Sequence, residues 1–109
     1  MAIVAVSISP VGAGVSVGEH VARALAVLEG QERVRFEPGP MFTTLEGPLP
    51  EIFELILRMQ EAVFEGGAQR VGMVVKTDER RDRAATAEEK VRRVLELLGR
   101  GREDPEGAP

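Results

Sequence analysis

The sequence predicts an α+β sandwich in which helices cover one face of an antiparallel four-stranded sheet. One observation is the order of the predicted elements: strand, helix, strand, strand, helix, strand and one further helix. A second is the connection "PGP" between the second and third strands, which is too short for a crossover and makes these strands antiparallel. A third is the N-terminal strand, whose alternation of apolar and small residues is typical of a strand buried on one face.

The first half of the chain contains a strand, a helix and a hairpin. In "AIVAVSIS" the branched apolar side chains alternate with Ala5, Ser7 and Ser9, so the two sets lie on opposite faces. "SVGE" is a capping box, and it predicts a helix that begins at Ser16. "RVRFE" and "MFTTLEG" then form the hairpin. A three-residue turn would pair Phe36, which is expected to face the helices, with Phe42, which is expected on the uncovered face. A bulge or a longer turn is therefore required.

The second half contains a helix, a strand and the added helix. Pro50 suits a first helical turn, and Gly66 ends the apolar stripe that follows it. "QRVGMVVKTD" is the fourth strand, and a capping box of Thr86 and Glu89 begins the last helix. Right-handed crossovers and short connections then predict a ferredoxin-like βαββαβ sandwich with a C-terminal helix added, and the spatial strand order four, one, three, two.

Composition predicts the domain organisation and excludes several classes of protein. Residues 1–100 form a single ferredoxin-like domain, and 101–109 form a disordered tail, since "GREDPEGAP" has little apolar surface to bury. A net charge of −4 and four aromatic residues, all phenylalanine, argue against a nucleic-acid partner. The N-terminal strand lacks a basic flank and is too short to span a bilayer, so we expect a cytoplasmic protein without a membrane partner.

The uncovered face of the sheet is the predicted binding site. Strand parity places a row of side chains there: Phe42, Thr44 and Glu46 on the third strand, Ser7 and Ser9 on the first, and Lys76 on the fourth. Glu46 is the most informative of them, because a carboxylate withdrawn from water needs a partner. If a second subunit covered this face, the row would become a dry pocket with convergent polar groups.

Other readings of these charged residues stay open. Glu46 could form an ion pair with Lys76 or an arginine across a subunit interface, which is how buried charges are usually compensated. Arg80 and Arg81, in the charged run "DERRDR", could bind an anion or form interface salt bridges.

Catalysis and metal binding find little support in the sequence. The chain has no cysteine, which removes thiol catalysis, disulfides and thiolate metal sites together. The one histidine, His20, has no second histidine beside it to complete a metal site and is expected to be exposed. No serine has a credible histidine base, and Glu46 has no second acid on its face. We therefore expect neither an enzyme nor a resident cofactor.

Four stretches, "VSISPVGAG", "FEPGPMFTTLEG", "GAQRV" and "VVKTDERRD", together resemble the small thiamine-binding protein family. The resemblance implies ferredoxin-like subunits that pair sheet to sheet, often as dimers of dimers, and that bind thiamine or its hydroxymethylpyrimidine half. Thr43 and Glu46 match the threonine and glutamate of the family's hairpin. The family's basic strand-end motif is matched by Lys76, Arg80, Arg81 and Asp82.

The residues and the resemblance together lead to one expected function. We expect a binding protein for thiamine or hydroxymethylpyrimidine that holds its ligand on the open sheet face, at a subunit interface of a homodimer or homotetramer. Glu46 would accept hydrogen bonds from an aminopyrimidine, and Phe42 would offer a stacking face. The alternative is a structural or regulatory oligomeric module without a pyrimidine ligand, and a weaker third hypothesis is an enzyme acting on a pyrimidine.

Overall fold

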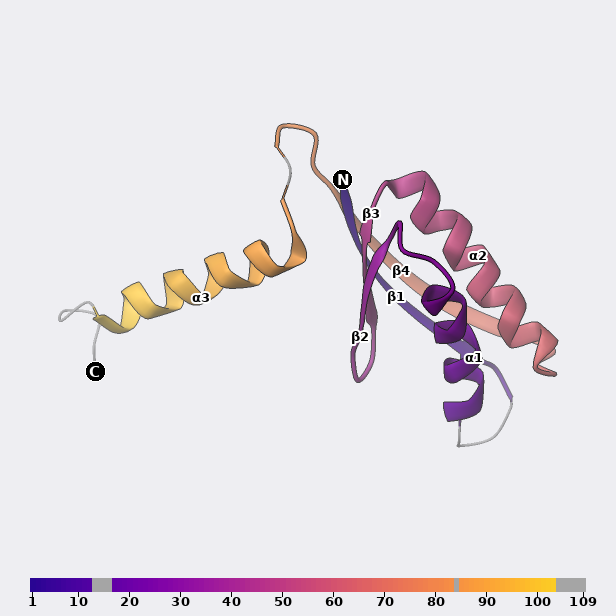
Figure 1. Ribbon diagram of the computed structural model, residues 1–109. Helices are drawn as coiled ribbons and strands as arrows, with labels where there is room; N and C mark the ends of the chain where they lie inside the picture. Colours follow the sequence, from indigo (N-terminus) through magenta and orange to yellow (C-terminus); the bar gives the residue numbers. More distant parts are fainter. Residues whose placement is uncertain (13–16, 84, 104–109) are drawn as a thin grey trace.

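The computed structural model describes residues 1–12, 17–83 and 85–103. Figure 1 shows a sheet with two helices on one side and a third helix on the other. The elements are β1 (Ala2–Pro10), α1 (Gly18–Glu29), β2 (Arg35–Pro38), β3 (Thr43–Gly47), α2 (Leu49–Glu65), β4 (Val71–Glu79) and α3 (Ala87–Glu103).

The sheet has the predicted topology. Its strand order is β2-β3-β1-β4, and each neighbouring pair is antiparallel. Helices α1 and α2 lie together on one face, while the opposite face has no such layer (Figure 1). The ferredoxin-like fold class is therefore confirmed.

The hydrophobic core lies between the sheet and the pair α1 and α2. Val4, Val6 and Ile8 of β1 are buried on this side, as the alternating pattern predicted. Burial of one such side chain contributes about 1.5–3 kcal/mol to folding. The largest fully buried side chains are Leu28, Leu45, Ile52, Ile56, Met59, Val4 and Val63. This packing holds β1 and β3 in place and orients their alternate side chains to the open face.

The turn of the β2–β3 hairpin is longer than three residues, which is one of the two arrangements that the sequence predicted. Phe36 pairs with Leu45 and Pro38 pairs with Thr43, so residues 39–42 form the turn. Gly39 is needed there, because a Cβ atom at this position would lie 2.5 Å from the carbonyl oxygen of Phe42. The turn thereby sets the register that places each side chain of β3.

The helix boundaries follow the capping signals where these can be compared. Helix α2 carries Pro50 in its first turn, as predicted. Before α3, the backbone N–H of Glu89 donates to Thr86 Oγ1 at 3.1 Å, and the Thr86 N–H donates to Glu89 Oε2 at 3.4 Å, which confirms the capping box. The cap predicted at Ser16 lies outside the described residues. No helix in the described ranges is both long and apolar enough for a bilayer span.

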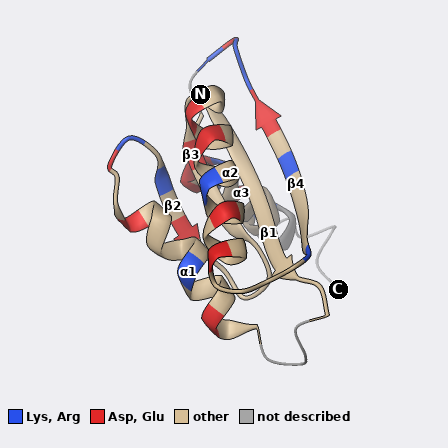
Figure 2. Ribbon diagram, turned by 90° about the vertical axis from the view of Figure 1, so that its right-hand side faces the viewer, with Lys and Arg blue, Asp and Glu red and all other residues tan. Residues whose placement is uncertain are grey.

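Helix α3 leaves the domain on the side of the open sheet face (Figure 1). It follows a charged segment after β4, residues 80–83, in which three arginines accompany Asp82 (Figure 2). The helix continues to Glu103, three residues into the segment 101–109 for which disorder was predicted, and 104–109 lie outside the described residues. Its position beside the open face brings a helix to the candidate site.

Candidate functional site

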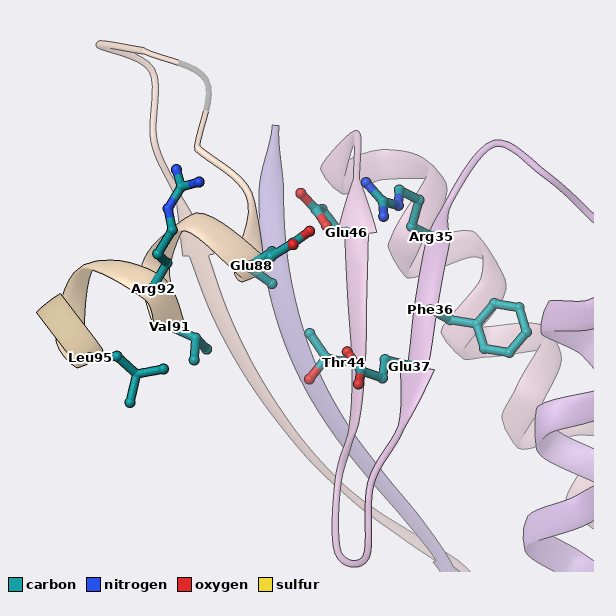
Figure 3. A pocket seen from close by; sticks show the side chains of 10 residues that line it. Arg35, Phe36, Glu37, Thr44, Glu46, Glu88, Val91, Arg92 and Leu95 are labelled. Carbon is teal, nitrogen blue, oxygen red and sulfur yellow. The ribbon is translucent and has the colours of Figure 1, made fainter.

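A cavity of about 640 Å³ lies between the open face of the sheet and the first half of α3 (Figure 3). This volume is within the range of small-molecule sites, roughly 300–1,000 Å³. The strands contribute Arg35, Phe36, Glu37, Thr44 and Glu46, and the helix contributes Ala87, Glu88, Val91, Arg92 and Leu95. The ring of Phe36 points away from the cavity, toward α1 (Figure 3).

Glu46 is the buried polar group of this cavity. It is 8% exposed, and its Oε1 atom has no hydrogen-bond partner among the described residues. Glu46 stands opposite Ile3 on β1 and opposite Arg35 on β2. Buried acceptors are nearly always satisfied, and leaving one unpaired costs about 1–3 kcal/mol. The Oε1 atom is therefore an unsatisfied acceptor beside the cavity.

Thr44 lines the cavity one row further along β3. It pairs with Glu37 on β2 and with Ala5 on β1, and Ala5 in turn pairs with Lys76 on β4. Lys76 thus lies on the open face as predicted, but on the far side of β1 and outside the cavity lining. Among the described residues no ion pair joins it to Glu46 within one chain.

The remaining residues of the predicted row lie further along the sheet. Ser7 pairs with Val74 and Ser9 with Gly72, four and six positions along β1 from Ile3. At about 3.4 Å per residue these positions are about 14 and 20 Å from the row of Glu46. Ser7, Ser9 and Phe42 therefore do not line this cavity. Strand parity assigned the face of Ser7 and Ser9 correctly, whereas their distance from Glu46 depends on the antiparallel register, and Phe42 lies in the hairpin turn before β3 begins.

Thr43 has a different environment from Thr44. It pairs with Val6 of β1 and is buried on the helix side of the sheet. Its side chain therefore lies on the face opposite the cavity, although the resemblance had matched this threonine to a binding residue.

The two arginines after β4 are engaged in local ion pairs. Arg80 binds Asp82 through two hydrogen bonds of 2.5 and 2.8 Å, and Arg81 donates to Glu79 at 3.4 Å. The hydrogen bonds from Arg80 lower the pKa of Asp82 to about 2, and the same contact raises the pKa of Arg80. Both arginines are exposed, and neither lines the cavity of Glu46.

A smaller cavity of about 230 Å³ lies between the end of β4 and the other side of α3. Arg80 and Asp78 line it together with Lys90 of α3. Lys90 donates a hydrogen bond to Asp78, and this bond lowers the pKa of Asp78 below its ordinary value. The contact ties the start of α3 to the sheet.

Sequence reasoning missed the contribution of α3 to the site. Glu88, Val91 and Leu95 recur at helical spacing and face the cavity, and Figure 3 shows the Glu88 side chain directed toward Glu46. This spacing was visible in the sequence, but nothing in it indicated which surface the added helix would meet. Arg35 and Glu37 were missed because the hairpin register was unknown.

Metal chemistry has no support in the described part of the chain. No group of three or more potential metal-binding side chains is found there. His20 is half-buried rather than exposed, and its Nδ1 atom has no hydrogen-bond partner among the described residues. A lone histidine of this kind is insufficient for a metal site.

The model of a family described as thiamine-binding proteins matches residues 4–95. The chain belongs to the thiamine-binding protein family. Similar proteins that carry the name UPF0045 protein include YqgV and MJ1052. YqgV of Bacillus subtilis is 37% identical over 102 residues, which cover 90% of this chain and 98% of YqgV. MJ1052 of Methanocaldococcus jannaschii is 36% identical over 92 residues, covering 84% of this chain and 90% of MJ1052.

Similar solved structures share the fold. The crystal structure of MJ1052 aligns with a TM-score of 0.79 and 34% identity, covering 88% of this chain and 97% of that protein. TM0486 of Thermotoga maritima, whose name places it in thiamine biosynthesis or salvage, aligns with a TM-score of 0.72 and 25% identity, covering 85% and 97%. This thiamine-binding family member thus has the ferredoxin-like fold of its solved relatives.

Proposed function

We propose that the chain binds thiamine or its hydroxymethylpyrimidine moiety in the cavity between the open sheet face and α3. The observation that carries the proposal is the buried Oε1 atom of Glu46, which has no hydrogen-bond partner among the described residues and borders a cavity of about 640 Å³. An exocyclic amine is a donor that would satisfy this atom. Family membership independently favours the same ligand class.

The cavity has the chemistry that an aminopyrimidine joined to a cationic ring requires. Glu46 would accept from the amine, and the Thr44 hydroxyl would serve a neighbouring ring atom. Val91 and Leu95 supply an apolar wall for a flat ring. The carboxylates in the lining outnumber the guanidinium groups, which favours a positively charged ligand: Glu37, Glu46 and Glu88 against Arg35 and Arg92.

We propose binding without catalysis, by a homodimer or homotetramer whose interface covers the open face. Val74, which pairs with Ser7 on β1, is exposed on that face, and Phe42 is exposed in the adjacent hairpin turn, so both would otherwise leave apolar surface in water. Their exposure equally favours the alternative, a structural or regulatory oligomeric module without a pyrimidine ligand.

Isothermal titration with thiamine, hydroxymethylpyrimidine and a panel of amino acids separates these functions. A saturable response to the pyrimidines alone is expected for the proposed function. Absence of any pyrimidine response from a folded oligomer would contradict it and favour the structural module. Mass spectrometry of the titrated mixture tests the weaker enzyme hypothesis, since a new product would overturn binding without catalysis.

A further inference from the structure

The smaller cavity, between the end of β4 and α3, is lined by more positive than negative side chains. Its cationic residues come from the segment after β4 and from α3: Arg80, Arg83, Lys90 and Arg93. Its carboxylates are those of Asp78 and Glu89. The chain as a whole has a net charge of −4, so this surplus of positive charge is local. A hollow surface with such a surplus attracts anions.

The two carboxylates of this cavity already have partners within the chain. Lys90 donates a hydrogen bond to Asp78. The Oε2 atom of Glu89 accepts a hydrogen bond from the backbone N–H of Thr86 at 3.4 Å. Both acidic groups therefore serve to hold the start of α3, and the cationic groups determine what the cavity attracts.

Two of the arginines are available to a ligand. Arg83 is exposed and forms no ion pair with any described residue. Arg93 lies 3.6 Å from Glu96 on the same helix, and an exposed pair of this kind contributes little to stability. Arg80, in contrast, is bound to Asp82 through two hydrogen bonds. An anion can thus recruit Arg83 and Arg93 without breaking a strong contact.

The size of the cavity and its donors favour a phosphate group. Its volume of about 230 Å³ is below the range of roughly 300–1,000 Å³ that is usual for sites enclosing a whole small molecule. Guanidinium groups match phosphate oxygens through paired N–H donors. Lys90 and Arg93 are three positions apart on α3, so their side chains lie on one face of the helix. They can therefore bind the same group.

The smaller cavity is a close neighbour of the larger one. Asp78, Ile3 and Glu46 lie directly opposite one another on β4, β1 and β3. Two strand spacings of about 4.8 Å place Asp78 about 10 Å from Glu46 along this row. Consecutive residues of α3 line the two cavities, Lys90 the smaller and Val91 the larger. A group bound in one cavity is thus within the length of a small molecule of the other.

We propose that the smaller cavity is a site for the phosphate or diphosphate group of a small molecule, held by Arg83 and Arg93 together with Lys90. The group comes either from the molecule that Glu46 binds or from a separate anion. In the first case the chain prefers phosphorylated thiamine to thiamine, and this preference rests on the proposed function. The anion site itself does not.

Titration of inorganic pyrophosphate at low ionic strength tests the site, because salt screens exposed charges. The parent chain should bind saturably, and the double variant Arg83→Gln with Arg93→Gln should bind about tenfold more weakly. Arg58→Gln is the matched control, since Arg58 is exposed on α2, on the other side of the sheet (Figure 1). Absence of binding by the parent, equal binding by the double variant, or equal weakening in the control would overturn the site.

NMR on the parent chain locates the anion without any variant. Amide signals of residues 80–83 and 87–90 should shift saturably as pyrophosphate is added. Arg35 is a cationic residue that lines the larger cavity and not the smaller. Shifts confined to the hairpin around Arg35 would place the anion in the larger cavity and overturn the proposal.

Titration of thiamine and thiamine diphosphate identifies the source of the phosphate group. If one molecule spans both cavities, the parent should bind the diphosphate more tightly, and the double variant should lose this difference while it keeps its affinity for thiamine. Equal affinities in the parent, together with pyrophosphate binding, would support a separate anion. Pyrophosphate binding without a thiamine response would contradict the proposed function and support the anion site. Thiamine binding without either phosphate effect would overturn the anion site alone.

Discussion

Glu46 on β3 lies directly opposite Arg35 on β2, yet the Oε1 atom of Glu46 accepts no hydrogen bond from any described residue. Both side chains line the same cavity, and Figure 3 shows the Arg35 side chain directed toward Glu46. Glu46 is buried and lines the cavity, so this unsatisfied acceptor lies at the cavity surface.

Glu46→Gln should weaken ligand binding by about tenfold to a hundredfold. The change keeps the shape but removes a charge-assisted hydrogen bond worth roughly 1.5–3 kcal/mol. Isothermal titration checks the affinity, with Glu54→Gln on α2 as the control. Unchanged affinity in an intact oligomer would contradict a binding role. If Glu46 instead pairs with Lys76 of another subunit, the main effect of Glu46→Gln should be a lower melting temperature or loss of assembly rather than weaker ligand binding.

Thr44→Val and Thr43→Val should have different effects. Thr44 lines the cavity and Thr43 is buried on the helix side. Loss of the Thr44 hydroxyl should reduce affinity by roughly tenfold, about the contribution of one hydrogen bond, with little change in stability. Thr43→Val should leave affinity unchanged. Titration of both variants checks this. The reverse result would support a binding role for Thr43, the threonine that the family resemblance had indicated.

The carboxyl group of Asp82 should titrate at about pH 2 in the folded protein, because Arg80 binds its ionised form. A lowered pKa means that the contact stabilises the fold above the ordinary range near pH 4, and that this contribution is lost as the pH falls toward 2. Side-chain NMR titration measures the midpoint. Arg80→Ala should return it to the ordinary range, and Arg81→Ala, which removes a contact to Glu79, should not.

Neither Arg80→Ala nor Arg81→Ala should unfold the chain, since both arginines are exposed. Looser assembly or weaker contacts to a ligand phosphate are the expected consequences. Circular dichroism and light scattering of the two variants check this. Loss of folding would show that the segment is a structural network.

Gly39→Ala should destabilise the protein by about 1–3 kcal/mol, because the added Cβ would lie 2.5 Å from the carbonyl oxygen of Phe42 in the hairpin turn. Gly99→Ala is the control. A Cβ there meets no atom within 4 Å, and helix propensity predicts a gain of up to about 1 kcal/mol. Urea unfolding measures both changes. Equal stability of the parent and Gly39→Ala would show that the turn relaxes easily.

The sequence by itself determined the elements and their facing, because these depend on neighbours a few residues apart. Alternation assigned Val4, Val6 and Ile8 to the core, and Thr86 with Glu89 marked the start of the last helix. The short hairpin connection made β2 and β3 antiparallel, and topology rules then gave the strand order.

Tertiary structure alone decided which of these residues meet. The predicted row is not contiguous: Ser7 and Ser9 lie further along β1 than Glu46, and Lys76 lies on the other side of β1. Sequence could not show this, because register depends on pairing between segments distant in sequence. The location of α3 was likewise undetermined, since periodicity defines an apolar stripe but not the surface that receives it. Packing therefore decided that Glu46 is buried, that Val91 and Leu95 line its cavity, and that the apolar stripe of α3 remains exposed.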